Sequence, residues 1–150
     1  MRCEAGCADC CRRELSITSV EAAAIEALFS TMSDAMRAEI RARADNAEPC
    51  AALDESGRCL VYTARPLVCR SHGVPIRFAP PAEARAKALP MLDVCPKNFE
   101  GASLADVDPA CVLDQQTMSV MLGLIDTVYT QERGGARGER VALRDVLRRA

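Results

Sequence analysis

The sequence predicts a mainly α-helical protein: a small helical domain with a cysteine-rich loop region and at most a short β hairpin. Two observations lead to this fold class. Apolar residues recur at the three- and four-residue spacing of a helix in segments that begin near residues 18, 33 and 109. The cysteines gather instead at the N-terminus and in connectors that contain glycine and proline. With 150 residues, 49% of them hydrophobic, the chain suits a single domain over residues 1–150.

Two helices are predicted in the first third of the chain. Thr18 and Glu21 have the spacing of a capping box, and the apolar residues that follow, from Ile25 to Met32, recur at helical spacing. A second and more exposed helix is expected from Ser33, because the sequence there is rich in alanine and mixes both signs of charge.

The clearest helix signal lies in the C-terminal half. Asp108 is a preferred N-cap and Pro109 suits the first helical position, so a helix is expected from there to about Gln131. Its apolar residues cover a wide arc, which predicts a helix buried among others and not an exposed binding stripe. Residues 141–149 (VALRDVLRR) are expected to form a short amphipathic helix. The locally basic run 132–150 is interpreted as a solvated helix face.

The middle of the chain combines turns with short extended segments. Pro66 suits the first turn of a short helix that ends near Gly73. Before this helix, the sequence predicts a turn at residues 54–57 and a strand at 59–62. After it, an extended segment is expected at 74–78 and a surface excursion at 80–90.

Charge and hydropathy argue against two kinds of partner. A net charge of −2 and a sequence pI of about 5.5 lack the basic excess of a nucleic-acid-binding protein. No stretch approaches the ~18 apolar residues of a membrane span. The N-terminus has charged residues and cysteines where a leader peptide would be apolar. We therefore expect a cytoplasmic protein with neither a nucleic-acid nor a membrane partner.

The number of cysteines indicates metal thiolates. Thiols stay reduced in the cytoplasm, and nine cysteines, an odd number, do not suit a disulfide scaffold. CEAGCADCC (3–11) contains four of them, and Cys7 with Cys10 forms a C-x2-C half-site for a tetrahedral ion. Neighbouring side chains diverge along most backbones, so the adjacent pair Cys10 and Cys11 either serves two metals or a polynuclear cluster, or one of the two is spare.

Eight cysteines are enough for two sites of four thiolates each. The candidate metal ligands are Cys3, Cys7, Cys10, Cys11, Cys50, Cys59, Cys69 and Cys95. At least one site is expected to combine the N-terminal motif with Cys69 or Cys95, which would make the loop region metal-organised. Cys111 lies in the first turn of the predicted helix 109–131 and is expected to be a small core residue and not a ligand.

Three blocks of the sequence resemble a known family. CEAGCADCCRRELSITSVEAAAI, CAALDESGRCLVYTARPLVCRSHG and DVCPKNF are similar, in order, to the blocks of the YkgJ-like cysteine-cluster family, the CxxCxxCC domain called a putative zinc- or iron-chelating domain. The resemblance covers about residues 1–125, and its most specific part is RPLVCR (65–70) with Gly57 and Cys59 before it. The strict motif would place its first cysteine at Glu4, where this chain has Cys3 one residue earlier.

Zinc and an iron–sulfur cluster both suit soft thiolate ligands, and the surplus of cysteines leans toward the cluster. The sequence therefore predicts a cysteine-ligated metal-binding protein with a structural, interaction or accessory role. The alternative is a redox or electron-transfer protein, or an enzyme that uses an iron–sulfur cluster. No catalytic constellation is recognised, so enzymatic activity stays open, as do substrate, protein partner and pathway.

Three further side chains near the cysteines have two interpretations each. His72, the only histidine, is expected to cap the short helix or to bond a backbone carbonyl, and binding a metal is the alternative. Arg65 and Arg70 flank Cys69 and either neutralise thiolate charge or are surface arginines.

Overall fold

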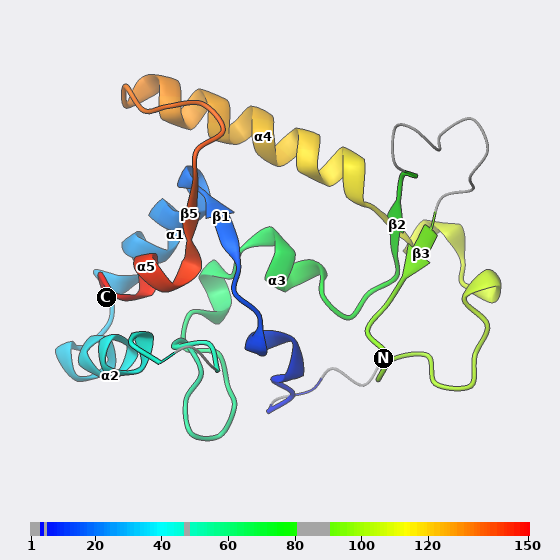
Figure 1. The fold of residues 1–150 in the computed structure, drawn as a ribbon, viewed down its shortest axis with the longest axis horizontal. Helices are drawn as coiled ribbons and strands as arrows, with labels where there is room; N and C mark the ends of the chain where they lie inside the picture. The colour runs from blue at the N-terminus through cyan, green and yellow to red at the C-terminus, as the bar shows by residue number, and fades with distance from the viewer. Residues whose placement is uncertain (1–3, 5, 47–48, 81–90) are drawn as a thin grey trace. The chain divides into compact units, whose positions relative to one another are not determined.

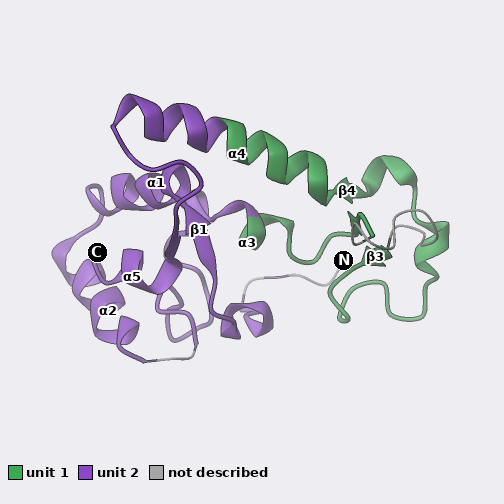
Figure 2. Ribbon diagram, turned by 45° about the horizontal axis from the view of Figure 1, so that its top comes forward, with its two compact units in different colours: residues 1–3, 68–124 green, residues 4–67, 125–150 purple. Residues whose placement is uncertain are grey.

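The computed structural model describes residues 4, 6–46, 49–80 and 91–150. The chain separates into two compact units, coloured in Figure 2. The larger unit comprises residues 4–67 and 125–150, and the smaller unit comprises residues 1–3 and 68–124. Each unit is described by itself below.

The first and last strands of the chain pair in the larger unit. Strand β1 (Ser16–Thr18) pairs antiparallel with β5 (Arg140–Ala142), so that Ile17 lies opposite Val141. Figure 1 shows this blue and red pair next to the helices α1 (Ser19–Phe29) and α5 (Leu143–Leu147), while α2 (Asp34–Ala44) lies below them. The largest fully buried side chains of the described residues belong to this unit: Ile17, Ile25, Ile40, Val146 and Leu147.

Helices α1 and α2 form as the sequence predicts. Thr18 is the N-cap of α1, and the Glu21 carboxylate accepts a hydrogen bond from the Thr18 amide at 2.9 Å, which completes the capping box. The other oxygen of Glu21 accepts from the Leu67 amide at 2.7 Å, so this side chain also fixes the segment that leaves the larger unit. Ser33 caps α2 by accepting from the amide of Met36. The predicted C-terminal helix is confirmed as α5.

The smaller unit contains a sheet that the sequence did not predict. Strand β2 (Ile76–Phe78) is central, with β3 (Met91–Asp93) antiparallel on one side and β4 (Leu113–Asp114) parallel on the other. Helix α3 (Leu67–Ser71) precedes it, as expected from Pro66. With two small sheets among the described residues, the fold is mixed α and β, and the expectation of a mainly α protein with at most one hairpin is corrected.

Two predicted segments of the middle differ from expectation or cannot be compared. Residues 59–62 do not form a strand, because only Cys59 pairs, in an isolated bridge with Leu53, and the chain then enters a 3-10 turn, η2 (Tyr62–Ala64). The extended segment at 74–78 is confirmed by β2. Most of the predicted surface excursion, residues 81–90, lies outside the described residues.

Helix α4 (Gln115–Glu132) begins later than the sequence predicts. Asp108 does cap a helical turn by accepting from the Ala110 amide at 2.9 Å, but that turn is only the 3-10 segment η5 (Pro109–Cys111). The chain then extends as β4, since Leu113 and Asp114 pair with β2. Asp114 accepts from the Thr117 amide at 2.8 Å and caps the long helix. The N-cap of this helix is therefore Asp114 and not Asp108.

The prediction that this helix is buried by its apolar residues is wrong. Its large exposed hydrophobic side chains are Val120, Met121, Leu124, Ile125 and Val128, each more than half exposed. Its buried residues are instead the polar Asp126 and Thr130. Asp126 accepts a hydrogen bond of 2.9 Å from the amide of Val20 in the first turn of α1, so a hydrogen bond holds the C-terminal half of α4. Among the described residues no helix has the length and hydropathy of a membrane span.

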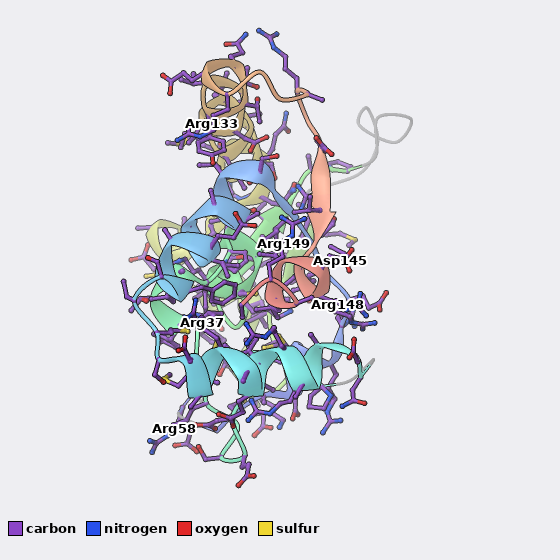
Figure 3. The ribbon with its side chains drawn as sticks, turned by 90° about the vertical axis from the view of Figure 1, so that its left-hand side faces the viewer. Arg37, Arg58, Arg133, Asp145, Arg148 and Arg149 are labelled. Carbon is purple, nitrogen blue, oxygen red and sulfur yellow. The ribbon has the colours of Figure 1, made fainter. Side chains whose placement is uncertain are left out.

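The basic run 132–150 is not simply solvated, because several of its arginines form ion pairs within the larger unit. Arg149 lies 2.8 Å from Glu26, and Arg144 lies 2.6 Å from Glu14. Arg148, which directly follows α5, pairs with Asp145 of that helix and with Asp45 after α2; Arg148 and Asp145 are labelled in Figure 3. These contacts bind the end of the chain to its first third.

Candidate metal centre

The N-terminal cysteines lie in a helical turn that is bonded directly to the middle of the chain. Cys10 and Cys11 belong to the 3-10 segment η1 (Asp9–Arg12), which the Cys11 amide closes by donating to Ala8 at 2.9 Å. The carbonyl oxygen of Cys11 then accepts from the amide of Cys50, also at 2.9 Å. This backbone bond brings together thiols that are far apart in the sequence.

Cys50 and Cys59 have similar backbone partners. The sulfur of each accepts a hydrogen bond from the amide two residues further on, Ala52 for Cys50 and Val61 for Cys59, and this bond lowers the pKa of the thiol. The two segments are joined, because Leu53 bridges to Cys59 and the Leu60 amide donates to Ala52 at 2.7 Å. An amide directed at sulfur favours the thiolate form, which is the form that binds a metal.

A tight loop between these two cysteines supports Cys59. The Asp54 carboxylate accepts from the amides of Arg58 and Ser56 at 2.8 and 2.9 Å and from the Ser56 hydroxyl at 2.7 Å. The pKa of Asp54 is lowered by these bonds, the Arg58 amide first. The turn predicted at residues 54–57 is therefore confirmed.

Two glycines fix the N-terminal loop against this turn. Gly6 has φ +90° and Gly57 has φ +76°, conformations that favour glycine. A Cβ atom on Gly57 would lie 3.0 Å from the carbonyl oxygen of Gly6. The loop that contains Gly6 continues into Cys7, whose amide donates to Glu4 at 3.0 Å. Cys7 is half-buried in the same unit.

The thiols of Cys10, Cys11, Cys50 and Cys59, which we call the four-thiol cluster, influence one another electrostatically. The pKa of Cys11 is raised to about 12, first by burial and then by the charges of Cys10, Cys50 and Cys59 and a hydrogen bond with Cys10. Burial is also the main cause of the raised pKa values of Cys50 and Cys59, and Cys10 contributes to both. Without a cation, buried thiols this close to one another favour their protonated forms.

Two arginines act in the opposite direction. Arg65 stacks on the Tyr62 ring, with its guanidinium carbon 3.8 Å from the ring centre, and its charge lowers the pKa of Cys59. Arg144 lowers the pKa of Cys50 in the same way. The sequence suggested that Arg65 either neutralises the charge of clustered thiolates or is a surface arginine, and its effect on Cys59 favours the first interpretation. Nothing in the sequence indicated Arg144, because a basic run does not show which distant residue, here Cys50, each of its arginines approaches.

A cavity of about 250 Å³ adjoins the cluster in the larger unit. Cys11 and Cys50 contribute to its wall, together with the charged side chains of Arg13, Glu14, Arg144 and Arg148. The cysteine cluster thus has a polar and accessible side, where solvent or a metal ion can approach.

The remaining predicted ligands are placed as follows. Cys69 in α3 and Cys95 belong to the smaller unit, and both are half-buried. Buried Asn98 joins their segments, since its amide nitrogen donates to the Gly73 carbonyl and its backbone bonds to Cys95 at 2.8 Å. Cys3 lies outside the described residues.

Two expectations about single side chains are now decided. Cys111 is exposed, so its assignment to the core is wrong: the 3-10 turn that contains it does not continue into the long helix. His72 Nδ1 lies 3.0 Å from the Val68 carbonyl oxygen, which confirms the expected bond to a backbone carbonyl at the end of α3. Tyr62 is 60% exposed and its ring packs under Arg65.

Within the described residues, no group of three or more cysteine, histidine or carboxylate side chains is already arranged to hold a metal ion. The four-thiol cluster therefore has electrostatic coupling without ligating geometry. The chemistry of the donors nevertheless fits a soft metal, because a thiophilic cation would relieve the mutual repulsion of the thiolates and replace their protons.

The structure and these thiols define a small cysteine-rich protein whose donor groups suit a soft metal. A family model described as "CxxCxxCC: Putative zinc- or iron-chelating domain" matches residues 2–96, and the chain belongs to this family. Family membership supports metal binding by this protein. No curated protein and no solved structure matches the chain.

Proposed function

We propose that the four-thiol cluster is the core of a metal centre that holds zinc or an iron–sulfur cluster. One observation carries the proposal: the half-buried thiols of Cys10, Cys11, Cys50 and Cys59 form one electrostatically coupled group, with the Cys11 and Cys50 backbones hydrogen-bonded to each other. Thiols whose pKa is raised by partial burial and by neighbouring thiols gain the most from a bound cation, because the metal stabilises the thiolates that burial disfavours.

The turns at Cys50 and Cys59 support this role. Hydrogen bonds from amides to the sulfurs orient the thiols and offset part of their negative charge. Four thiolates around a divalent ion leave a net charge of about −2, and Arg65 beside Cys59 compensates part of it.

The choice between zinc and an iron–sulfur cluster rests on the adjacent pair. The side chains of Cys10 and Cys11 are hydrogen-bonded to each other. The charge of Cys10 raises the pKa of Cys59, and the charge of Cys59 raises the pKa of Cys11. Two adjacent thiols suit a polynuclear cluster better than a single small ion, so we favour iron–sulfur. The role is then structural or accessory, and electron transfer is the alternative.

We retain Cys7, Cys69 and Cys95, and Cys3 outside the described residues, as further ligands on the strength of their spacing. Cys7 lies in the loop that Gly6 and Gly57 fix beside the cysteine turns. Eight thiolates would complete two centres or one larger cluster.

Metal analysis with a sulfide assay tests the proposal. The protein is purified anaerobically and analysed for zinc, iron and acid-labile sulfide, and we expect a brown preparation with iron and sulfide. Cys50→Ser should lose metal, whereas Cys111→Ser, at an exposed cysteine outside the cluster, should keep the wild-type stoichiometry. Wild-type protein that contains neither zinc nor iron would refute the proposal. A colourless protein with stoichiometric zinc would decide for zinc.

The participation of Cys69 is tested separately. If Cys69 completes a centre with the N-terminal motif, Cys69→Ser should reduce metal content and also expose Cys10 and Cys11 to alkylation. A variant with full metal content and protected N-terminal thiols would exclude Cys69 from that centre.

A further inference from the structure

We propose that Arg144 is a positioning residue of the metal centre, whose guanidinium compensates thiolate charge at Cys50 and is itself moderated by Glu14. This inference rests on the proposed metal centre. Arg144 lies beyond residues 2–96, the part of the chain that the family model matches, so the C-terminal segment adds a component to the centre that the family motif does not contain.

The strand pairing brings Arg144 to this place. In the β1–β5 register Ser16 lies opposite Ala142, and the pairing continues one step further, because the Leu143 amide donates to the Leu15 carbonyl at 2.8 Å. Antiparallel strands run in opposite directions, so the next residue of each strand is Glu14 or Arg144. Their side chains form an ion pair of 2.6 Å.

The side chain is then held near the thiols. Arg144 lines the cavity of about 250 Å³ whose wall includes Cys11 and Cys50, and its side chain is only 26% exposed. The adjoining helix α5 is anchored by the buried side chains of Leu143, Val146 and Leu147. Because the backbone next to Arg144 is fixed by the core, the charge has a defined position relative to Cys50.

The charge of Arg144 acts at Cys50 because both side chains line the same cavity. The guanidinium favours the thiolate of Cys50, whereas burial of that sulfur opposes it. Glu14 has the opposite sign and forms an ion pair with Arg144, so it weakens the field of Arg144 at the cluster. Arg148 lines the same cavity but pairs with Asp45 and Asp145. It is therefore a matched control for the loss of a positive charge.

Opposite effects of the two partners distinguish this role from a structural ion pair. Arg144→Gln and Glu14→Gln break the same ion pair and should change the stability of the metal-free protein similarly. Their effects on metal affinity should differ in sign, because one removes a positive charge and the other a negative charge beside the thiolates. Arg144→Lys keeps the charge and should retain most of the affinity.

The measurement is a titration of the metal-free, reduced full-length protein with Co²⁺, followed by displacement with Zn²⁺. The charge-transfer band from thiolate to cobalt reports binding. We expect Arg144→Gln to weaken Co²⁺ affinity about tenfold, a typical effect of a group that supports a metal ligand. Glu14→Gln should strengthen it, and Arg148→Gln should leave it unchanged.

Two results would overturn the inference. One is an Arg144→Gln protein with wild-type affinity, and the other is an equal loss in Arg144→Gln and Glu14→Gln, which would mean that the pair only braces the fold. In both cases wild-type protein still shows the thiolate band, so the proposed function stands. If wild-type protein gives no thiolate band with Co²⁺ and binds no zinc or iron, the metal centre itself is refuted and this inference with it.

Discussion

The amide of Cys50 donates to the carbonyl oxygen of Cys11 at 2.9 Å, and this bond joins the N-terminal motif to the central loop through backbone alone. A backbone bond does not depend on a metal. It can hold the two segments near each other while the thiols are still protonated, so that metal binding has to order side chains and not the whole chain.

Removal of the metal should nevertheless loosen the cysteine segments more than the helical core. After chelation we expect faster hydrogen exchange for residues 6–12 and 49–60, because the backbone bond between Cys11 and Cys50 then holds them without the added restraint of bonds from thiolate to metal. The amides of α1 should stay protected, because Ile25 and Phe29 are buried in the hydrophobic core and their burial does not depend on the four-thiol cluster. Hydrogen exchange followed by mass spectrometry measures both regions in one sample, and equal protection with and without metal in the cysteine segments would contradict this expectation.

The close approach of Gly6 and Gly57 predicts that Gly57→Ala is damaging. An alanine there would have φ +76° and a Cβ atom 3.0 Å from a backbone oxygen that cannot move aside freely. Gly134→Ala is the matched control, since Gly134 has φ +67° and open space around its Cβ position. Urea unfolding should show a loss of about 1 kcal/mol for Gly134→Ala and clearly more for Gly57→Ala. Equal losses would mean that the contact with Gly6 has no energetic role.

Asp54 predicts a pH dependence of the metal-free protein. The ordinary pKa of an aspartate is 3.8, and this value applies in the unfolded chain. In the folded state, hydrogen bonds lower the pKa of Asp54 below it. The unfolded state therefore binds the proton more readily, and the stability that Asp54 contributes is present above pH 3.8 and is lost as the pH falls through the lower folded pKa. Asp54→Asn should be less stable than wild type at pH 6, and the difference should shrink below pH 3.8. A difference that is constant with pH would exclude the carboxylate charge as its cause.

Asp126 should be important for holding α4, although its surroundings on that helix are apolar. Its carboxylate is 2% exposed and accepts from the Val20 amide at 2.9 Å. Asp126→Ala should cost about 2 kcal/mol in urea unfolding, because the amide loses a charged acceptor at the start of α1. Asp126→Asn keeps an acceptor and should cost less. The expectation fails if Asp126→Ala is no more destabilising than Glu132→Ala at the exposed end of the helix.

Local signals account for the parts of the fold that were predicted correctly. Thr18 and Glu21 specify the start of α1 within four residues, and Ser33 does the same for α2, so each helix end is encoded where it occurs. The start of α4 was misplaced because Asp108 and Asp114 are both good N-caps. Only the pairing of β4 with β2 decides between them.

Residue type and short spacing alone specified the thiols, their clustering in the sequence and the turn around Asp54. Tertiary structure alone decided which thiols meet and what surrounds them. The strands β1 and β5 are three residues each and pair across more than a hundred residues, too short to be recognised locally. That pairing places Arg144 beside Cys50. The exposed apolar side of α4 has the same cause, since the burial of a helix face depends on what packs against it and not on its own periodicity.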